Sequence, residues 1–154
     1  MNPLLKWPGG KRRLAPRILE GLPRGLRLVE PFAGSAAVFL HAPAHFSGAL
    51  LADLCAHVVA FHRAVRQDPA GLLAALEALP REGWRDHYAG LRAAHNGARD
   101  AVPSEGFGLA AHAARFLWLN RTAFNGLYRE NRSGEMNAPP GDYVPGRRRE
   151  DFRL

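Results

Sequence analysis

The pattern of apolar and polar positions divides the chain into a short front part with strands and a longer helical part. Apolar runs at Leu26–Glu30 and Ala49–Asp53 are short and each ends in an acid, so they predict two short apolar strands. A small-residue turn at Pro31–Ser35 and a helix at Ala36–His41 are expected between them. This order predicts a β–loop–α–β unit, the opening of a doubly wound parallel sheet.

The remaining apolar positions recur every three to four residues, which indicates helices. The expected helices are Leu14–Leu22, Cys55–Arg66, Pro69–Leu79, Trp84–His95 and Phe107–Leu119, with a loop at Gly97–Gly106. No segment after Asp53 has the pattern of a further buried strand, although a parallel sheet needs more than two. The front part is therefore predicted to be an incomplete sheet.

The most polar segment, residues 119–143, combines basic, aromatic and amide side chains in the sequence LNRTAFNGLYRENRSGEMNAPPGDY. Asn125-Gly126 and Ser133-Gly134 are turn dipeptides, so we expect a folded-back loop or hairpin and not a helix. Arginine can form paired hydrogen bonds with a guanine edge, asparagine with an adenine edge, and an aromatic ring can insert between bases. These residue types favour nucleic-acid recognition over the alternative of a simple polar surface hairpin.

Charge and cysteine content narrow the class of protein. With 21 Lys and Arg against 14 Asp and Glu, the net charge of +7 is compatible with a polyanionic partner, although charge alone is weak evidence. The single cysteine, Cys55, excludes an internal disulfide and a multi-cysteine zinc site, and it fits a reducing cytoplasm. No apolar run resembles a signal peptide or a membrane span, so a cytoplasmic protein is expected. The seven histidines form no H-E-x-x-H motif, and no metal site is predicted.

The turn after the first predicted strand has the composition of a nucleoside-binding loop. Small residues there let the backbone turn tightly and approach a ligand, and Asp53 follows at about the distance of a ribose-binding carboxylate. The absence of G-x-G-x-x-G and of a P-loop lysine disfavours dinucleotides and nucleoside triphosphates. S-adenosylmethionine fits better, because its ribose suits Asp53 and its positive charges suit an acid such as Glu30. The alternative is an ordinary tight turn with two surface acids.

Three blocks, in order, resemble the Dam-type adenine-specific DNA methyltransferases. Lys6-Trp7-Pro8-Gly9-Gly10-Lys11 resembles the N-terminal K-W-x-G-G-K of that family. Residues 29–39, followed by Ala52-Asp53, resemble its cofactor loop and the acid after it. Residues 119–143 resemble its recognition hairpin, L-N-R-x-x-[FY]-N-G-L-x-R-x-N…G-x-[FM]-N-x-P-x-G-x-Y. The resemblance covers most of the chain, from Leu5 to Tyr143.

The resemblance implies roles position by position. S-adenosylmethionine would be held by Trp7, Lys11, Phe32, Gly34 and Asp53. Phe124 would insert into double-stranded DNA, Asn125 would face the orphaned base, and Arg129 would read base edges in the major groove. The other DNA contacts it implies are Lys6, Leu127, Pro139 and Tyr143.

The sequence departs from the family in two places. Pro140 and Asp142 stand where the family favours an aromatic and a basic residue, and Asp142 would weaken a phosphate contact. The catalytic Asp-Pro-Pro-Tyr is absent, and Ala138-Pro139-Pro140-Gly141 lacks both its acid and its aromatic. No catalytic residue is therefore assigned, and the 154 residues are expected to be the front part of a longer enzyme, or a derivative of one, that is inactive alone.

The predicted fold class is α/β: an incomplete Rossmann-like S-adenosylmethionine-dependent methyltransferase fold with an inserted helical target-recognition domain and a β-hairpin. Residues 1–56 would begin the cofactor-binding domain, 57–144 would form the recognition domain, and 145–154 a basic tail. Two other functions stay open. One is a DNA-binding module with a vestigial cofactor site, and the other is one half of a split methyltransferase completed by a second polypeptide.

Overall fold

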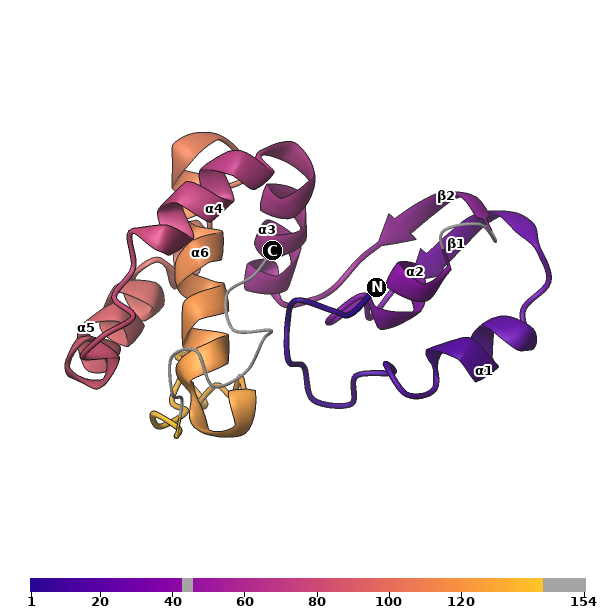
Figure 1. The fold of residues 1–154 in the computed structure, drawn as a ribbon. Coiled ribbons are helices and arrows are strands. Elements are labelled where there is room, and N and C mark those ends of the chain that lie inside the picture. The colour runs from indigo at the N-terminus through magenta and orange to yellow at the C-terminus, as the bar shows by residue number, and fades with distance from the viewer. Residues whose placement is uncertain (43–45, 143–154) are drawn as a thin grey trace. The chain divides into compact units, whose positions relative to one another are not determined.

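The computed structural model describes residues 1–42 and 46–142. The chain divides into two compact units, Met1–Val59 and Ala60–Leu154 (Figure 1). The elements, in chain order, are α1 (Ala15–Glu20), β1 (Gly25–Glu30), α2 (Ala37–His41), β2 (Phe46–Leu51), α3 (Ala56–Gln67), α4 (Pro69–Glu77), α5 (Trp84–Gly97), the 3-10 turn η1 (Arg99–Ala101), α6 (Gly106–Thr122) and the 3-10 turn η2 (Phe124–Gly126). The predicted mixed α/β class is confirmed. No helix within the described residues has the length and hydrophobicity that a membrane span requires.

The first unit is built on a parallel pair of strands. β1 and β2 pair with Gly25 opposite Phe46 and Glu30 opposite Leu51, as the β–loop–α–β pattern predicted. The sheet has two strands among the described residues. Its small core comprises Ala15, Leu19, Leu28, Val38 and Ala42, with Ile18 and Phe46 packed against them.

The second strand lies earlier in the chain than the sequence predicted. It begins at Phe46 and ends at Leu51, whereas the prediction ran from Ala49 to Asp53. Asp53 is outside the strand because its carboxylate accepts backbone hydrogen bonds from Gly34 and Cys55, which fixes it in the turn that follows. The acid at the strand end is thus part of the loop structure.

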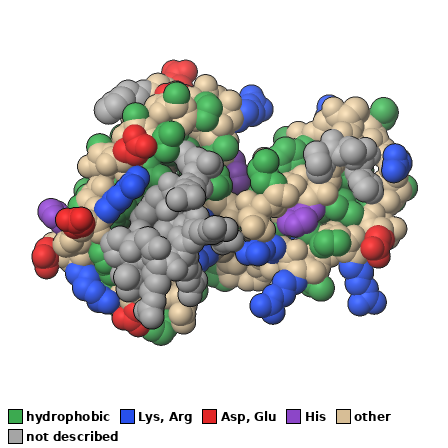
Figure 2. Space-filling model, in the orientation of Figure 1, with side chains coloured by type: hydrophobic (Ala, Val, Ile, Leu, Met, Phe, Trp, Pro, Cys, Tyr) green, Lys and Arg blue, Asp and Glu red, His purple; other side chains and the backbone are tan. Residues whose placement is uncertain are grey.

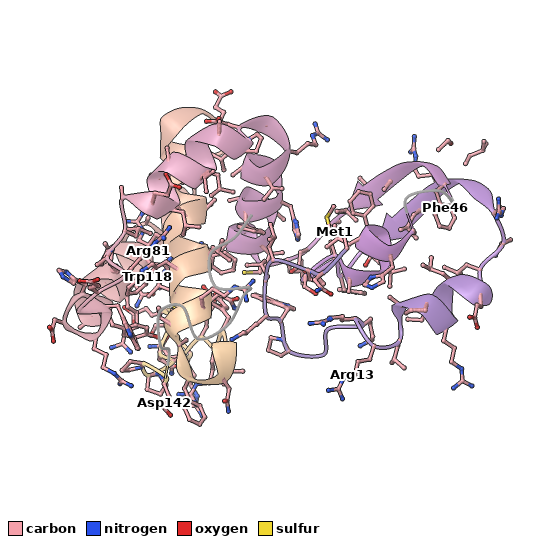
Figure 3. All side chains as sticks on the ribbon, viewed as in Figure 1. Met1, Arg13, Phe46, Arg81, Trp118 and Asp142 are labelled. Carbon is pink, nitrogen blue, oxygen red and sulfur yellow. The ribbon has the colours of Figure 1, made fainter. Side chains whose placement is uncertain are left out.

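The second unit is organised around α6, which packs against both α4 and α5 (Figure 1). A helix with apolar residues on all sides must be enclosed by other elements, and α6 buries Leu109, Ala110, Ala113, Ala114, Phe116, Leu117 and Trp118. Trp118 points from α6 toward α5 (Figure 3), where its ring contacts those of Trp84 and Tyr88. All three aromatic residues are buried in the core of this unit.

Local sequence signals explain where the helices begin. α4 starts at Pro69, and the side chain of Asp68 caps it by accepting from the amide of Gly71 at 2.8 Å.

α6 differs from the prediction at its C-terminal end, because it continues to Thr122 and includes the first four residues of segment 119–143. Leu119 and Asn120 are fully buried there, so packing extends the helix. The predicted loop after α5 contains η1.

Candidate functional site

In the first unit, the loop from Phe32 to Ala36 is the most constrained backbone. Gly34 has a φ of 48° and Ala36 a φ of 53°, so two positions close together adopt the left-handed conformation. That conformation costs an L-residue such as Ala36 free energy, and such positions cluster at ligand sites. The amide of Ala33 donates to the carbonyl of Ala52 at 2.8 Å, which joins this loop to the end of β2.

The N-terminal motif and the loop meet at Gly34. A Cβ atom added at Gly34 would lie 2.5 Å from Cδ1 of Trp7, closer than real contacts permit. The indole ring of Trp7 therefore lies directly against this glycine. The tight turn of residues 7–10, closed by a hydrogen bond from the Gly10 amide to the Trp7 carbonyl at 3.0 Å, presents the ring.

Asp53 joins the same group. Its Oδ2 accepts from the Gly34 amide at 2.8 Å and its Oδ1 accepts from the Cys55 amide at 2.9 Å. A carboxylate offers about four lone-pair directions, so the two amides leave capacity for two hydroxyl donors. The structure thus brings together Trp7, Gly34 and Asp53, three of the five residues that the resemblance implied for the cofactor.

The other two predicted cofactor residues lie on the surface of this unit. The ammonium group of Lys11 donates to the Gly9 carbonyl at 2.6 Å. The ring of Phe32, two residues after the end of β1, is 81% exposed. Glu30, at the end of β1, accepts from the Phe39 amide on α2 at 2.6 Å. Burial raises the pKa of the Glu30 carboxyl, and this hydrogen bond acts in the opposite direction.

In the second unit, α6 is followed by a tight turn that exposes two of the predicted recognition residues. Asn125 has a φ of 54° and Gly126 a φ of 67°, as expected for an Asn-Gly turn. The buried side chain of Asn120 donates to the Gly126 carbonyl at 3.1 Å and holds the turn on the end of α6. The ring of Phe124 is 49% exposed, and Asn125 is exposed beside it.

The return of the chain closes this turn. The Phe124 amide donates to the Pro139 carbonyl at 2.9 Å, and the Gly141 amide donates to the Thr122 carbonyl at 2.8 Å. A Cβ at Gly141 would lie 2.8 Å from the Ala123 carbonyl oxygen. Glycine is therefore required where the two segments cross.

Residues 129–137 form a short antiparallel hairpin, as the sequence predicted. The Asn137 amide donates to the Arg129 carbonyl at 3.0 Å, and the Asn131 amide donates to the Glu135 carbonyl at 2.9 Å. The side-chain Oδ1 of Asn131 accepts from the amides of Ser133 and Glu135, both at 2.9 Å. This arrangement forms the predicted turn at the tip.

The two faces of the hairpin differ in polarity. Met136 and Tyr128 are buried, whereas Arg129, Leu127 and Asn137 are exposed. The guanidinium Nε of Arg129 donates to Oδ1 of Asn137 at 2.8 Å, so this side chain is already oriented by its cross-strand neighbour. Arg129 thus lies on the accessible face with a defined direction.

Lys and Arg side chains lie at separate positions on the visible face of Figure 2 and form no single patch there. Asp142, which departs from the family pattern, forms an exposed ion pair with Arg85 at 3.2 Å. Its charge is thereby partly offset. Tyr143 and the basic tail, residues 145–154, lie outside the described residues.

Sequence reasoning missed the contribution of α5 to the hairpin. Tyr88, Arg92 and Asn96 all hydrogen-bond to its backbone. Burial raises the pKa of Tyr88 to about 12, while the positive charge of Arg92 acts in the opposite direction. The Tyr88 hydroxyl therefore stays protonated as a donor. The available signal was the spacing of these polar residues at intervals of four, which places them on one face of the helix.

Two buried histidines were also missed. His95 on α5 and His112 on α6 are almost fully buried, and their ring centroids lie 5.4 Å apart. Nε2 of His95 lies 3.2 Å from the Tyr128 hydroxyl, which itself donates to Glu130 at 2.9 Å. Since that hydroxyl proton is used on Glu130, His95 acts as the donor to Tyr128.

Comparison with known proteins gives a consistent result. The family model of the D12 class N6 adenine-specific DNA methyltransferases matches residues 7–151. The chain is 36% identical over 141 residues to a DNA adenine methylase of Escherichia coli, covering 90% of this chain and 47% of that protein. It is 33% identical over 141 residues to a DNA adenine methylase of Vibrio cholerae, with the same coverage. A type II methyltransferase of Lactococcus lactis is 33% identical over 145 residues, covering 93% and 49%. The chain spans about half the length of these relatives.

Proposed function

The chain belongs to the D12 class of N6 adenine-specific DNA methyltransferases, and from that premise we propose that it binds the cofactor and recognises DNA for such an enzyme. The reaction would transfer a methyl group from S-adenosylmethionine to N6 of adenine in double-stranded DNA. The observation that carries the proposal is the contact of three separate sequence positions at one place: the Trp7 ring lies against Gly34, whose amide binds Asp53.

The residues of the first unit fit S-adenosylmethionine. Asp53 has lone pairs beyond those that accept from Gly34 and Cys55, and ribose hydroxyls are suitable donors for them. Phe32 offers an exposed ring for an adenine base, and the ammonium group of Lys11 suits a carboxylate. When bound, this cofactor supplies the methyl group, and the residues named here bind and orient it.

In the second unit, we assign DNA recognition to the turn at Phe124 and to the hairpin that follows. Phe124 is exposed on a rigid turn, which suits insertion between bases, and Asn125 is positioned to pair with an orphaned base. Arg129 is oriented on the exposed face and suits reading of a base edge. Leu127, Pro139, Tyr143 and Lys6 are proposed as further contacts.

We also propose the division into domains that the sequence predicted. The part up to residue 56 would belong to a Rossmann-like cofactor domain, residues 57–144 to an inserted recognition domain, and the protein would act in the cytoplasm. The first unit exposes apolar side chains on and near its strands, with Leu26 86% and Leu54 94% exposed. Such residues fit a sheet that pairs and packs with further elements.

Methyl transfer also needs acceptors for the adenine amino group, which the family takes from Asp-Pro-Pro-Tyr. That motif does not occur in the 154 residues. We therefore propose that a further segment carrying it, in the same polypeptide or in a separate one, completes the active enzyme. Exposed apolar residues such as Leu26 and Leu50 are suited to receive it.

Cofactor binding by the 154-residue chain tests the first part of the proposal. Titration calorimetry with S-adenosylmethionine should give binding that Asp53→Asn weakens, because an amide nitrogen cannot accept a hydrogen bond. Phe124→Ala is the matched control and should leave this affinity unchanged. Wild-type affinity retained in Asp53→Asn would refute the assigned cofactor site.

Sequence-dependent DNA binding tests the second part. Arg129→Ala should reduce the preference for a GATC-type duplex over a scrambled duplex by about 1–3 kcal/mol, the value of a paired base contact. Arg132→Ala removes the same charge from the exposed tip of the hairpin, so it should weaken both duplexes equally and lower the salt dependence. Identical behaviour of the two variants would exclude the hairpin as the reading element.

A further inference from the structure

On the return arm of the hairpin, residues 135–138, the backbone of Met136 makes no hydrogen bond to the opposite strand. Met136 is bridged to Glu130 in an antiparallel pair, and the flanking hydrogen bonds run from Asn131 to Glu135 and from Asn137 to Arg129. In such a non-hydrogen-bonded pair, the residue's own amide and carbonyl point away from the opposite strand. The side chain of Met136 is 2% exposed, so these polar groups are away from water and need partners.

The side chain of Asn96 on α5 supplies both partners. Its Oδ1 accepts from the Met136 amide at 2.9 Å, and its Nδ2 donates to the Met136 carbonyl at 3.1 Å. One carboxamide therefore replaces the neighbouring strand that would otherwise pair with this edge. Because it both donates and accepts, it pairs with the amide and the carbonyl of the same residue, Met136.

Residues on the preceding turns of α5 bind the chain just after Met136, so the helix and this arm run antiparallel. The Arg92 guanidinium and the Tyr88 hydroxyl both donate to the Ala138 carbonyl at 3.0 Å. Arg99, just beyond α5, donates to the Ser133 carbonyl. α5 thus contacts the return arm at Met136 and Ala138, and Arg99 contacts the tip of the hairpin at Ser133.

The outgoing arm is attached to the same helix. His95, adjacent to Asn96, hydrogen-bonds to the Tyr128 hydroxyl. Tyr128 directly precedes Arg129, whose guanidinium is oriented by Asn137 on the return arm. α5 therefore binds the neighbours of both members of the Arg129–Asn137 pair: Tyr128 before Arg129, and Met136 before Asn137.

We propose that Asn96 is a positioning residue for DNA sequence recognition, which acts by fixing the register of the hairpin. A shift of one residue would turn Asn137 into the core and Met136 to the exposed face, because side chains alternate along a strand. Arg129 would then lose its cross-strand partner. The inference rests on the proposed function of the hairpin, and nothing in the sequence resemblance assigns a role to α5.

The test compares two substitutions at Asn96 in the 154-residue chain. Asn96→Asp keeps the acceptor for the Met136 amide and loses the donor to its carbonyl, whereas Asn96→Leu loses both. We expect the preference for matched over scrambled duplex to fall in the order wild type, Asn96→Asp, Asn96→Leu, and the last variant to approach Arg129→Ala. A base-edge contact carries a preference of about 5- to 150-fold, which sets the range to be lost. Affinity for the scrambled duplex should stay within about twofold, because phosphate contacts do not depend on register.

Arg85→Ala is the matched control. Arg85 also lies on α5 and also contacts the chain after the hairpin, through Asp142, but this ion pair is exposed. We expect its sequence preference to equal that of the wild type. Hydrogen exchange provides a second measurement that does not depend on DNA: Asn96→Leu should accelerate exchange of the Met136 amide and of its hairpin neighbours while α6 stays protected.

The outcomes separate this inference from the proposed function. If Arg129→Ala abolishes the preference and both Asn96 variants keep it, the hairpin reads DNA and Asn96 does not position it. If Arg129→Ala has no effect, or if the wild type shows no preference, the proposed recognition role fails together with the positioning role for DNA. Unchanged hydrogen exchange of the Met136 amide in Asn96→Leu would show that Asn96 does not fix the register of the hairpin. A loss of protection in α6 as well would show that the substitution unfolds the whole unit, and this result too would count against a specific role in register.

Discussion

Substitution of Gly34 by alanine tests the arrangement on which the cofactor site depends. The change adds one methyl group to the loop after β1. That group would lie 2.5 Å from Cδ1 and 3.1 Å from Nε1 of Trp7. Ring and loop cannot both keep their positions, and the backbone at this residue has a φ of 48°, which alanine adopts only with strain.

The expected loss can be divided between these two causes. A left-handed conformation costs an L-residue about 1–2 kcal/mol, and forcing an extra methyl group into a packed contact costs about 1–3 kcal/mol. Gly34→Ala should therefore reduce the free energy of unfolding of the first unit by about 2–5 kcal/mol. Gly9→Ala is the matched control, since Gly9 has a φ of 71° but its added Cβ would meet only the Lys11 Nζ at 3.8 Å. It should show the conformational cost alone.

A double-mutant cycle isolates the contact itself. In a Trp7→Ala background the added methyl group has space, so Gly34→Ala should cost only about 1–2 kcal/mol there. The difference between the two backgrounds measures the Trp7–Gly34 contact. Hydrogen exchange of the β1 and β2 amides gives the free energy of opening of this unit without a tryptophan signal. Calorimetry with S-adenosylmethionine should show the affinity falling in parallel.

Two results would refute this reasoning. If Gly34→Ala destabilises the first unit no more than Gly9→Ala does, the ring does not lie against the loop. If the cost of Gly34→Ala is the same with and without Trp7, the loss arises from the backbone or from another neighbour. In either case the proposal that the N-terminal motif and the cofactor loop form one site would lose its main support.

Three further predictions concern activity, pH dependence and DNA opening. The 154-residue chain should transfer no tritiated methyl group to adenine-containing duplex above a blank without protein, because Asp-Pro-Pro-Tyr is absent, and measurable transfer would contradict this. Burial raises the pKa of Glu30 above its ordinary value of 4.5, because the buried site disfavours the charged carboxylate. The contribution of the protonated carboxyl to the free energy of unfolding is therefore present below pH 4.5 and is lost as the pH rises through the raised pKa. Glu30→Gln should therefore stabilise the first unit at pH 7 and not below pH 4.5 in denaturant titrations, and equal effects at both would exclude this cause. Phe124→Ala should lower the 2-aminopurine signal of base opening more than the affinity for duplex, and should barely change stability because the ring is half exposed.

Sequence patterns located the local structure well where the residues themselves impose it. The parallel strand pair, the Asn125-Gly126 turn and the turn at Ser133-Gly134 all follow from short-range rules of strand length and backbone freedom. The errors are at boundaries where distant residues decide. β2 ends before Asp53 because that carboxylate binds the loop at Gly34, and α6 extends to Thr122 because Leu119 and Asn120 are buried.

The candidate site could be predicted only in part for the same reason. The resemblance assigned roles to Trp7, Gly34 and Asp53, but their direct contact comes from the fold. Asn96 by itself carried no signal of function, because an asparagine in an amphipathic helix is usually a surface residue, and only its spacing of four from Arg92 placed it on the face that binds the hairpin. Its importance arises from the Met136 backbone edge, a feature that exists only after the hairpin has folded against α5.

The two proposed sites, one in each unit, are thus held by different physical means. The loop at Gly34 is fixed by backbone conformations and close packing, which glycine and small residues impose locally. The hairpin has no core of its own and obtains its register from side chains on a helix, chiefly Asn96 and Tyr88. A loop of the first kind is recognisable from a short motif and tolerates little change. Recognition by an element of the second kind can be altered from residues that never touch DNA, so substitution of Asn96 on α5 should weaken the sequence preference while cofactor binding stays the same.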